Sequence, residues 1–235
     1  GENEGKWKKL CTITGYSLAK SMGDAKEFDG NFFIGLKDVE PAPHARVYKL
    51  KEDGSCFVQD QTLPDADAGE AIGTFVVFNN KLYTGTEHRG GLFRREGPGN
   101  WKLVQKGQDN VFFAGASIGN TLYWGTGQPG KIWKSSSGNS GSWQIAYENS
   151  EYGFYDAESF NGHAYMVGYK QQGGDLKKAV VLKFNGKDVV RKIELDGEYA
   201  WSSIISGDYM YVGTRGPGAI YKIGKNDNAE MVFSS

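Results

Sequence analysis

An all-β fold built from a repeated unit is what this sequence predicts, and three observations lead to it. The 235 residues include 34 glycines, 13 tyrosines, 13 phenylalanines and 6 tryptophans, a composition typical of short strands joined by tight turns. A strand–turn–strand pattern recurs along the whole chain. Segments before and after that pattern recur with it, so that each copy predicts four short strands.

The recurring pattern is clearest in "LYTGTEHRGGLFR" (82–94), "LYWGTGQPGKIWK" (122–134) and "MYVGTRGPGAIYK" (210–222), and more distant copies occupy 32–49 and 164–183. Each copy has an aromatic residue in its first strand and a basic residue at the end of its second. The aromatic residues are Phe33, Tyr83, Tyr123, Tyr165 and Tyr211, and the basic residues are Lys49, Arg94, Lys134, Lys183 and Lys222. A base once per unit is too regular for a ligand site, so we expect these bases to pack along a neighbouring strand or to pair with turn carboxylates.

Two further segments complete each unit. A small apolar segment ending in Asn, Asp or Gly, the residues of tight hairpin turns, precedes each aromatic strand. A polar hairpin and a fourth strand follow each base. One such sheet cannot bury both of its faces, whereas sheets packed around an axis can. The sequence therefore predicts a single domain over 1–235, a five-bladed β-propeller with four antiparallel strands per blade. The expected blades span 14–59, 68–105, 110–147, 152–194 and 198–233.

The N-terminal segment "KWKKLCTI" (6–13) also resembles a fourth strand. We expect it to form an extra N-terminal strand, and the pattern leaves open whether this segment or "AEMVF" (229–233) closes the ring. The two cysteines, Cys11 and Cys56, allow either one disulfide or two reduced thiols. A surface rich in Gly, Asn, Ser and aromatic residues favours an extracellular or periplasmic location.

The hairpin "IWKSSSGNSGSW" (132–143) resembles the Asp-box of sialidase-type propellers, which runs Ser-x-Asp-x-Gly-x-Thr-Trp. The Asp is missing here and the spacing differs by one residue, and the other four hairpins keep only the turn chemistry. The resemblance implies propeller blades with degenerate Asp-boxes, which stabilise hairpins on the outside of the fold and are not catalytic. The arginine cluster and Tyr/Glu pair of sialidases have no counterpart. A tachylectin, a five-bladed lectin, is similar in length and blade number, although its repeat sequence is absent.

Several partner classes are disfavoured by the composition. The chain carries 27 basic and 28 acidic residues, which gives no electrostatic reason to expect a nucleic acid or an anionic membrane. No apolar stretch approaches the roughly 18 residues of a membrane span, so we expect no membrane insertion. The three histidines are too dispersed for a metal triad, and no Ser-His-Asp or Cys-His arrangement is detectable. We therefore expect no metal and no cofactor.

Carboxylates on the first strands form one candidate site. In a propeller the first strand of each blade lines the axis, which places Asp24, Asp156 and Glu158 in the channel with Lys26. Two carboxylates on either side of a sugar are what glycoside hydrolysis requires. The alternative interpretation is structural: Lys26 pairs with one of these carboxylates, or water fills a polar channel.

Aromatic residues around the same strands form a second candidate site, because Tyr and Trp suit stacking on a sugar or packing in a protein interface. The candidates are Trp201, Tyr155, Phe113, Tyr199 and Tyr152. Three of them share one repeat column that holds glycine in the first two blades, which indicates a lopsided pocket. We expect a non-catalytic recognition propeller that binds a carbohydrate through this aromatic rim. The alternatives are a glycoside-active enzyme using the channel carboxylates and a protein-interaction scaffold.

Overall fold

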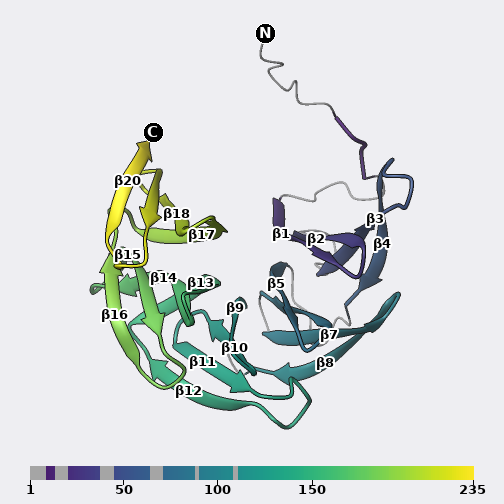
Figure 1. The fold of residues 1–235 in the computed structure, drawn as a ribbon, viewed down its shortest axis with the longest axis horizontal. Coiled ribbons are helices and arrows are strands. Elements are labelled where there is room, and N and C mark those ends of the chain that lie inside the picture. Colours follow the sequence, from purple (N-terminus) through teal and green to yellow (C-terminus); the bar gives the residue numbers. More distant parts are fainter. Residues whose placement is uncertain (1–8, 14–20, 38–44, 64–70, 88–89, 108–110) are drawn as a thin grey trace.

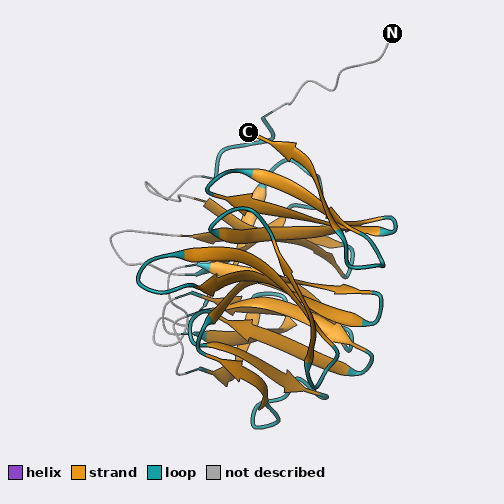
Figure 2. Cartoon of the chain, turned by 90° about the vertical axis from the view of Figure 1, so that its left-hand side faces the viewer, coloured by secondary structure: helices purple, strands orange, loops and turns teal. Residues whose placement is uncertain are grey.

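The computed structural model describes residues 9–13, 21–37, 45–63, 71–87, 90–107 and 111–235. These residues form twenty strands in five antiparallel sheets of four strands each, with no helix in the ranges described. Figure 2 shows the same chain from the side as stacked strands and connecting loops. The predicted all-β fold with five four-stranded blades is confirmed.

The five sheets follow one another along the chain, and we call them blades 1 to 5. Blade 1 contains β1 (Ser21–Phe28), β2 (Asn31–Lys37), β3 (Arg46–Leu50) and β4 (Phe57–Thr62). Blade 2 contains β5 (Ile72–Phe78), β6 (Lys81–Thr86), β7 (Gly91–Gly97) and β8 (Asn100–Lys106). Blade 3 contains β9 (Phe112–Ile118), β10 (Thr121–Thr126), β11 (Gly130–Ser135) and β12 (Gln144–Asn149). Blade 4 contains β13 (Tyr152–Phe160), β14 (His163–Gln171), β15 (Lys177–Phe184) and β16 (Val189–Glu194). Blade 5 contains β17 (Tyr199–Ser206), β18 (Tyr209–Arg215), β19 (Ala219–Ile223) and β20 (Ala229–Ser234).

Each blade is a simple meander whose strands pair in chain order. The first strand of each blade lies nearest the axis and the fourth lies outermost (Figure 1). Neighbouring inner strands pack in sequence, β1 against β5, β5 against β9, β9 against β13 and β13 against β17. Within the described part of the chain β17 has no comparable packing against β1, and Figure 1 shows the ring open between blade 5 and blade 1.

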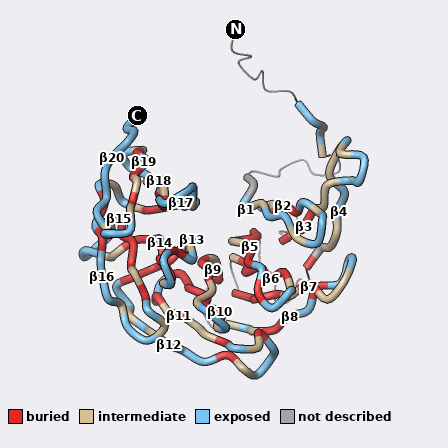
Figure 3. The backbone as a smooth tube through the Cα atoms, viewed as in Figure 1, coloured by how far each residue is buried: buried red, intermediate tan, exposed pale blue. Residues whose placement is uncertain are grey.

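The core of the protein is divided among the boundaries between blades. Four apolar clusters lie between blades 1 and 2, 2 and 3, 3 and 4, and 4 and 5. Figure 3 shows the buried backbone concentrated on the inner strands, whereas the outermost strands are largely exposed. Each sheet therefore buries its apolar faces against its neighbours, as the repeat requires.

In blades 2 and 4 the recurring base forms a hydrogen bond to the next blade. In blade 4, Tyr165 Oη donates a 2.5 Å hydrogen bond to Asp227, and Lys183 Nζ lies 2.8 Å from the same carboxylate. Asp227 belongs to the hairpin between β19 and β20 of blade 5. In blade 2, Arg94 donates a 2.6 Å hydrogen bond to Asn139, in the corresponding hairpin of blade 3. In these two blades the base thus reaches a hairpin of the following blade. Lys183 pairs there with a turn carboxylate, as one of the two interpretations expected, whereas the partner of Arg94 is an amide oxygen.

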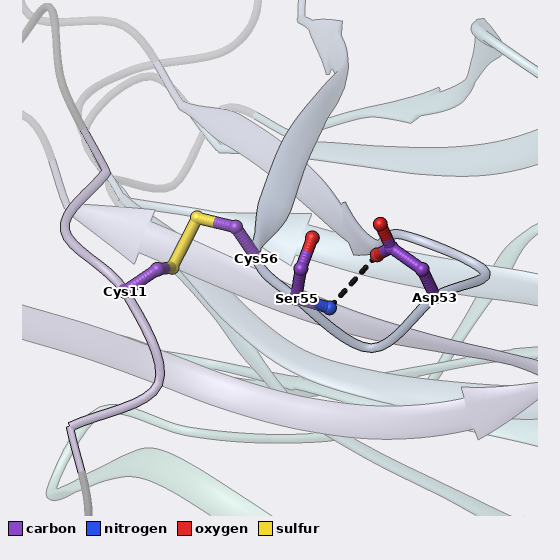
Figure 4. The surroundings of a disulfide bond; sticks show 4 residues. All are labelled: Cys11, Asp53, Ser55 and Cys56. Atoms are coloured by element: carbon purple, nitrogen blue, oxygen red, sulfur yellow. Dashed lines mark hydrogen bonds between the residues drawn. A yellow bond between two sulfur atoms is a disulfide. The ribbon is translucent and has the colours of Figure 1, made fainter.

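The N-terminal segment is joined covalently to blade 1. Cys11 and Cys56 form a disulfide with a Cα–Cα distance of 5.4 Å. Figure 4 shows this bond beside the hairpin that leads into β4, where the Ser55 N–H donates a 2.8 Å hydrogen bond to Asp53. Part of the predicted strand over 6–13 lies outside the described residues, and the described part, 9–13, is not in a strand. Among the described residues, no helix has the length and apolar character needed to cross a membrane.

Candidate functional site

Polar side chains on the inner strands bridge consecutive blades around the axis. Asp24 accepts a 2.6 Å hydrogen bond from the Phe75 N–H of blade 2, and Asp156 accepts hydrogen bonds of 2.6 and 2.8 Å from the N–H and Oγ of Ser203 in blade 5. Thr74 accepts a 3.1 Å hydrogen bond from the Gly115 N–H of blade 3. The pairing register of β5 and of β17 shifts beside Phe75 and Ser203. A β-bulge of this kind disrupts the ladder locally and can release an N–H group from it. The N–H groups of Phe75 and Ser203 are therefore able to donate to Asp24 and Asp156 of the preceding blades.

Two cavities open along the axis and meet at these bridging residues. One, of about 360 Å³, we call the polar cavity. The other, of about 400 Å³, we call the aromatic cavity. Residues that line both are Asp24, Thr74, Asp156 and Ser203. The polar cavity adds Lys26 and Glu158, whereas the aromatic cavity adds Glu87, Phe113, Tyr155 and Trp201.

The carboxyl groups at this junction hold their protons more tightly than usual. Burial raises the pKa of Asp156 to about 7, although the hydrogen bonds from Ser203 oppose the shift. Burial also raises the pKa of Glu158 to about 7, with Lys26 opposing it. The pKa of Asp24 is likewise raised by burial, against the hydrogen bond from Phe75. Near neutral pH Asp156 and Glu158 are therefore partly protonated and can donate as well as accept hydrogen bonds.

The aromatic cavity is walled by a cluster of rings from blades 3, 4 and 5. The rings of Tyr155 and Trp201 lie 4.5 Å apart between centroids at an interplanar angle of 31°. Phe113 lies 6.5 Å from Tyr155 on the other side. The Trp201 side chain is 48% exposed, so it presents part of its surface to solvent. The aromatic cavity is thus lined by these rings together with polar side chains.

Two more tyrosines pack against Tyr155 in this cluster. Tyr169 and Tyr199 lie 5.6 Å and 5.9 Å from Tyr155, and 5.3 Å from each other. The Lys177 ammonium donates a 2.7 Å hydrogen bond to the Tyr199 hydroxyl and lies 5.4 Å from the Tyr169 ring centroid. These contacts fix the rings against which Tyr155 rests.

The structure brings most of the predicted aromatic residues together. Phe113, Tyr155 and Trp201 line the aromatic cavity, and Tyr199 lies beside them in the cluster. Tyr152 lies elsewhere: it is buried in the core between blades 3 and 4, where its ring stacks on Phe154. The reason is the alternation of side chains along a strand, which places residues 152 and 154 on the same face. The binding role of the predicted aromatic residues stays a prediction.

The predicted channel carboxylates also lie together, but two of them have a structural task. Asp24, Asp156 and Glu158 all line the polar cavity, as the sequence suggested. Asp24 and Asp156 are occupied by backbone N–H groups of the following blade, whereas Glu158 faces the cavity near Lys26. Sequence reasoning did not single out Ser203 or Tyr169, whose positions depend on contacts between blades. In the part of the chain that the structure describes, no group of His, Cys, Asp or Glu is arranged to hold a metal ion.

Comparison with known proteins supports the fold. No protein-family model and no curated protein matches the sequence. A chain of the nidogen–laminin complex is similar with a TM-score of 0.65 and 11% identity, over 92% of this chain and 80% of that one. An alpha-L-arabinofuranosidase from Clostridium thermocellum is similar with a TM-score of 0.55 and 13% identity, over 94% of this chain and 96% of that one. At these identities the likeness shows the fold alone. Neither is described as a sialidase, so the Asp-box resemblance stays a prediction.

Proposed function

We propose that the protein is a non-catalytic recognition module that binds a carbohydrate in the aromatic cavity. The observation that carries this proposal is the pair Tyr155 and Trp201, which adjoin an open cavity of about 400 Å³. A sugar ring has an apolar face that suits stacking on such rings, and its hydroxyls need polar partners nearby. A partly exposed tryptophan beside a cavity is also a position where one side chain supplies much of a binding energy.

The polar lining of the aromatic cavity provides these partners. Asp24, Asp156 and Ser203 line it together, and Glu87 adds a further carboxylate. Because the pKa of Asp156 is about 7, this side chain is present in both protonation states at neutral pH. Its Oδ2 accepts two hydrogen bonds from Ser203 and its Oδ1 accepts one from the Ala157 N–H, so Oδ1 is the oxygen that can bond to a sugar hydroxyl, as an acceptor or, when protonated, as a donor. The acidic lining disfavours anionic ligands, so we expect a neutral or basic sugar.

The test is a glycan array followed by titration of the best binder, with Trp201→Ala as the principal variant. We expect Kd to rise by roughly 5- to 30-fold, which corresponds to a loss of about 1–2 kcal/mol of binding energy. Phe233→Ala is the matched control, because Phe233 is an exposed aromatic residue of blade 5 that does not line the cavity. Absence of glycan binding, or equal losses in both variants, would contradict the proposal. A protein partner that binds through Trp201 while sugars fail to compete would favour the scaffold alternative.

The location that fits this function is extracellular or periplasmic. The Cys11–Cys56 disulfide is the supporting observation, because disulfides persist mainly in oxidising compartments. The similar structures are compatible with recognition in a general sense: one comes from a complex of two proteins, and the other is an enzyme named for its action on an arabinofuranoside.

A second candidate function, hydrolysis of a glycosidic bond, is favoured by one specific observation. Asp156 and Glu158 line the same cavity and have pKa values of about 7, in the range that suits a general acid. Glycoside hydrolysis requires two carboxyl groups on either side of the scissile bond, one protonated as general acid and the other ionised as base or nucleophile. Under this alternative Glu158→Gln abolishes turnover of an aryl glycoside, whereas Glu230→Gln, on exposed β20, does not. No turnover across a panel of aryl glycosides would exclude it.

A further inference from the structure

The boundary between blade 5 and blade 1 differs from the other four. Each of the others contains an apolar cluster, and no such cluster among the described residues joins blade 5 to blade 1. We call this boundary the seam. Figure 1 shows it as the open side of the ring. The side chains on the two sheet faces that border the seam therefore determine which partner can bind there.

The seam-side face of blade 5 is apolar and exposed. The strand pairing places Ile204 opposite Tyr211 and Ile220 opposite Phe233, so these four residues share this face. Ile204 is 63% exposed and Phe233 is 57% exposed. The other face of the same sheet is buried against blade 4, through Met210, Val212 and their neighbours. Blade 5 thus has one face packed against blade 4 and another whose apolar side chains are exposed in the described structure.

The repeat shows what this face does in the other blades. The aromatic residue at the Tyr211 position is Phe33, Tyr83, Tyr123 or Tyr165 elsewhere, and these are 0%, 0%, 6% and 0% exposed. Each of the four packs into the cluster shared with the following blade. Tyr211 keeps the same residue type at the same position but is only half-buried. The side chain that normally anchors a following blade is present in blade 5.

The polar anchor is present as well. In blade 4, Tyr165 and Lys183 converge on the Asp227 carboxylate of the following blade. Tyr211 and Lys222 form the same cross-strand pair in blade 5. The described structure places no further hairpin opposite them, and the Lys222 ammonium lies 3.8 Å from the centroid of the Tyr209 ring of its own blade. The Tyr211 hydroxyl and the Lys222 ammonium are therefore placed to donate hydrogen bonds to a carboxylate or amide oxygen.

Blade 1 presents the complementary face. The residue before the aromatic anchor packs against the preceding blade in blades 2 to 5, where Leu82, Leu122, Ala164 and Met210 are all 0% exposed. The corresponding residue of blade 1, Phe32, is 40% exposed. The disulfide also holds the described residues 9–13, which belong to a segment resembling a fourth strand, next to this blade. Thr12 and Ile13 line a cavity of about 270 Å³ there, together with Tyr48 and Phe57.

We propose that the seam is a docking surface for one further blade, an antiparallel β-sheet of the same repeat. Its chemistry follows from the four existing boundaries. It presents a small or aliphatic residue at the Met210 position toward Ile204 and Ile220. It also presents a carboxylate or amide oxygen, in the hairpin between its third and fourth strands, toward Tyr211 and Lys222.

The test is a fusion in which a second copy of residues 195–235 follows Ser234 directly, in place of Ser235. This junction reproduces the connection between β16 and β17, and the copy carries its own Asp227. We expect the Tm to rise by about 5 °C or more, and the amides of β18 to exchange more slowly with solvent. An unchanged Tm, with rapid proteolytic removal of the added copy, would overturn the proposal.

The control is Ile220→Asp in both backgrounds. In the 235-residue chain Ile220 is exposed, so this change shifts the Tm by less than about 2 °C, whereas in the fusion it abolishes the gain. A second measurement does not depend on the folding of the fusion: the molecular mass of the 235-residue chain by light scattering. If the 235-residue chain is a monomer and Ile220→Asp leaves its Tm unchanged, the seam-side face of blade 5 is uncovered, as the proposal requires. A dimer that Ile220→Asp dissociates would show that a second copy occupies the face, and the proposal would be wrong.

Discussion

The hydrogen bond between Tyr165 and Asp227 gives the sharpest test of how the blades are joined. Tyr165→Phe removes only the hydroxyl, and the ring stays in the cluster between blades 4 and 5. Asp227 then keeps its ion pair with Lys183, whose Nζ lies 2.8 Å from the carboxylate. A hydrogen bond to a charged group contributes about 1.5–3 kcal/mol, so we expect the free energy of unfolding to fall by about 2 kcal/mol. For a chain of this size that corresponds to a decrease in Tm of about 4–8 °C.

The pH dependence of this loss has a definite sign. Burial acts to raise the pKa of Asp227, but the hydrogen bonds from Lys183 and Tyr165 outweigh it and lower the pKa below its usual value. A carboxylate whose pKa is lowered by folding stabilises the protein above its unfolded pKa of about 4, and this stabilisation is lost as the pH falls through the folded value. The Tyr165→Phe loss is therefore largest at neutral pH and shrinks below about pH 4.

The assay is urea unfolding followed by tryptophan fluorescence, at pH 7 and at pH 3, with Tyr211→Phe as the matched variant. Tyr211 occupies the same position in blade 5, but its hydroxyl meets no following blade in the described structure. Its removal therefore changes the free energy of unfolding by less than about 0.5 kcal/mol. Equal losses in the two variants, or no loss in Tyr165→Phe, would refute the reasoning.

Three further predictions concern single positions. Because folding raises the pKa of Asp156 to about 7, its contribution to stability is complete below about pH 4 and is lost as the pH rises through 7. Asp156 should contribute up to about 4 kcal/mol to the fall seen in urea titrations from pH 4 to 8, and Asp156→Asn should remove this part while the part due to Glu158 remains. Gly138 and Gly141 both have positive φ, but only at Gly138 would a Cβ meet the Tyr83 hydroxyl, so Gly138→Ala should lower the Tm more than Gly141→Ala does. Cys56→Ser opens a disulfide between residues 45 apart, and calorimetry should show a loss of about 2–4 kcal/mol.

The sequence was sufficient to predict the fold because the signal was periodic. The aromatic anchors and bases recur at the same place in each unit, and the structure places them at equivalent positions in all five sheets. The spacing of the repeat does not, however, predict where β-bulges occur. The register shift beside Asp156 in β13 is not visible in the letters, yet bulges of this kind determine which N–H groups reach the preceding blade.

The sequence could predict which residues gather at the candidate site, but not what each of these residues does there. Phe113, Tyr155 and Trp201 share a repeat column, and in the structure all three line one cavity. The assignment of Tyr152 to the rim failed because it depended on which face of β13 the side chain occupies. Asp24 and Asp156 were expected as channel carboxylates, and only the three-dimensional structure shows that backbone N–H groups of the next blade already bind them.

The open seam makes the described ring a stack with two ends, in which each blade is stabilised only by its neighbours. Unfolding of such a stack starts at its ends and spreads inward, and in blade 5 every residue of β20 is exposed. Hydrogen exchange should therefore be fastest in β20 and slowest in the middle blades. Trp201 lies on this fraying blade, whereas Tyr155 lies on blade 4. A ligand that contacts both rings would join blade 5 to blade 4 and slow the local unfolding of blade 5. The stability of blade 5 would therefore increase with ligand occupancy.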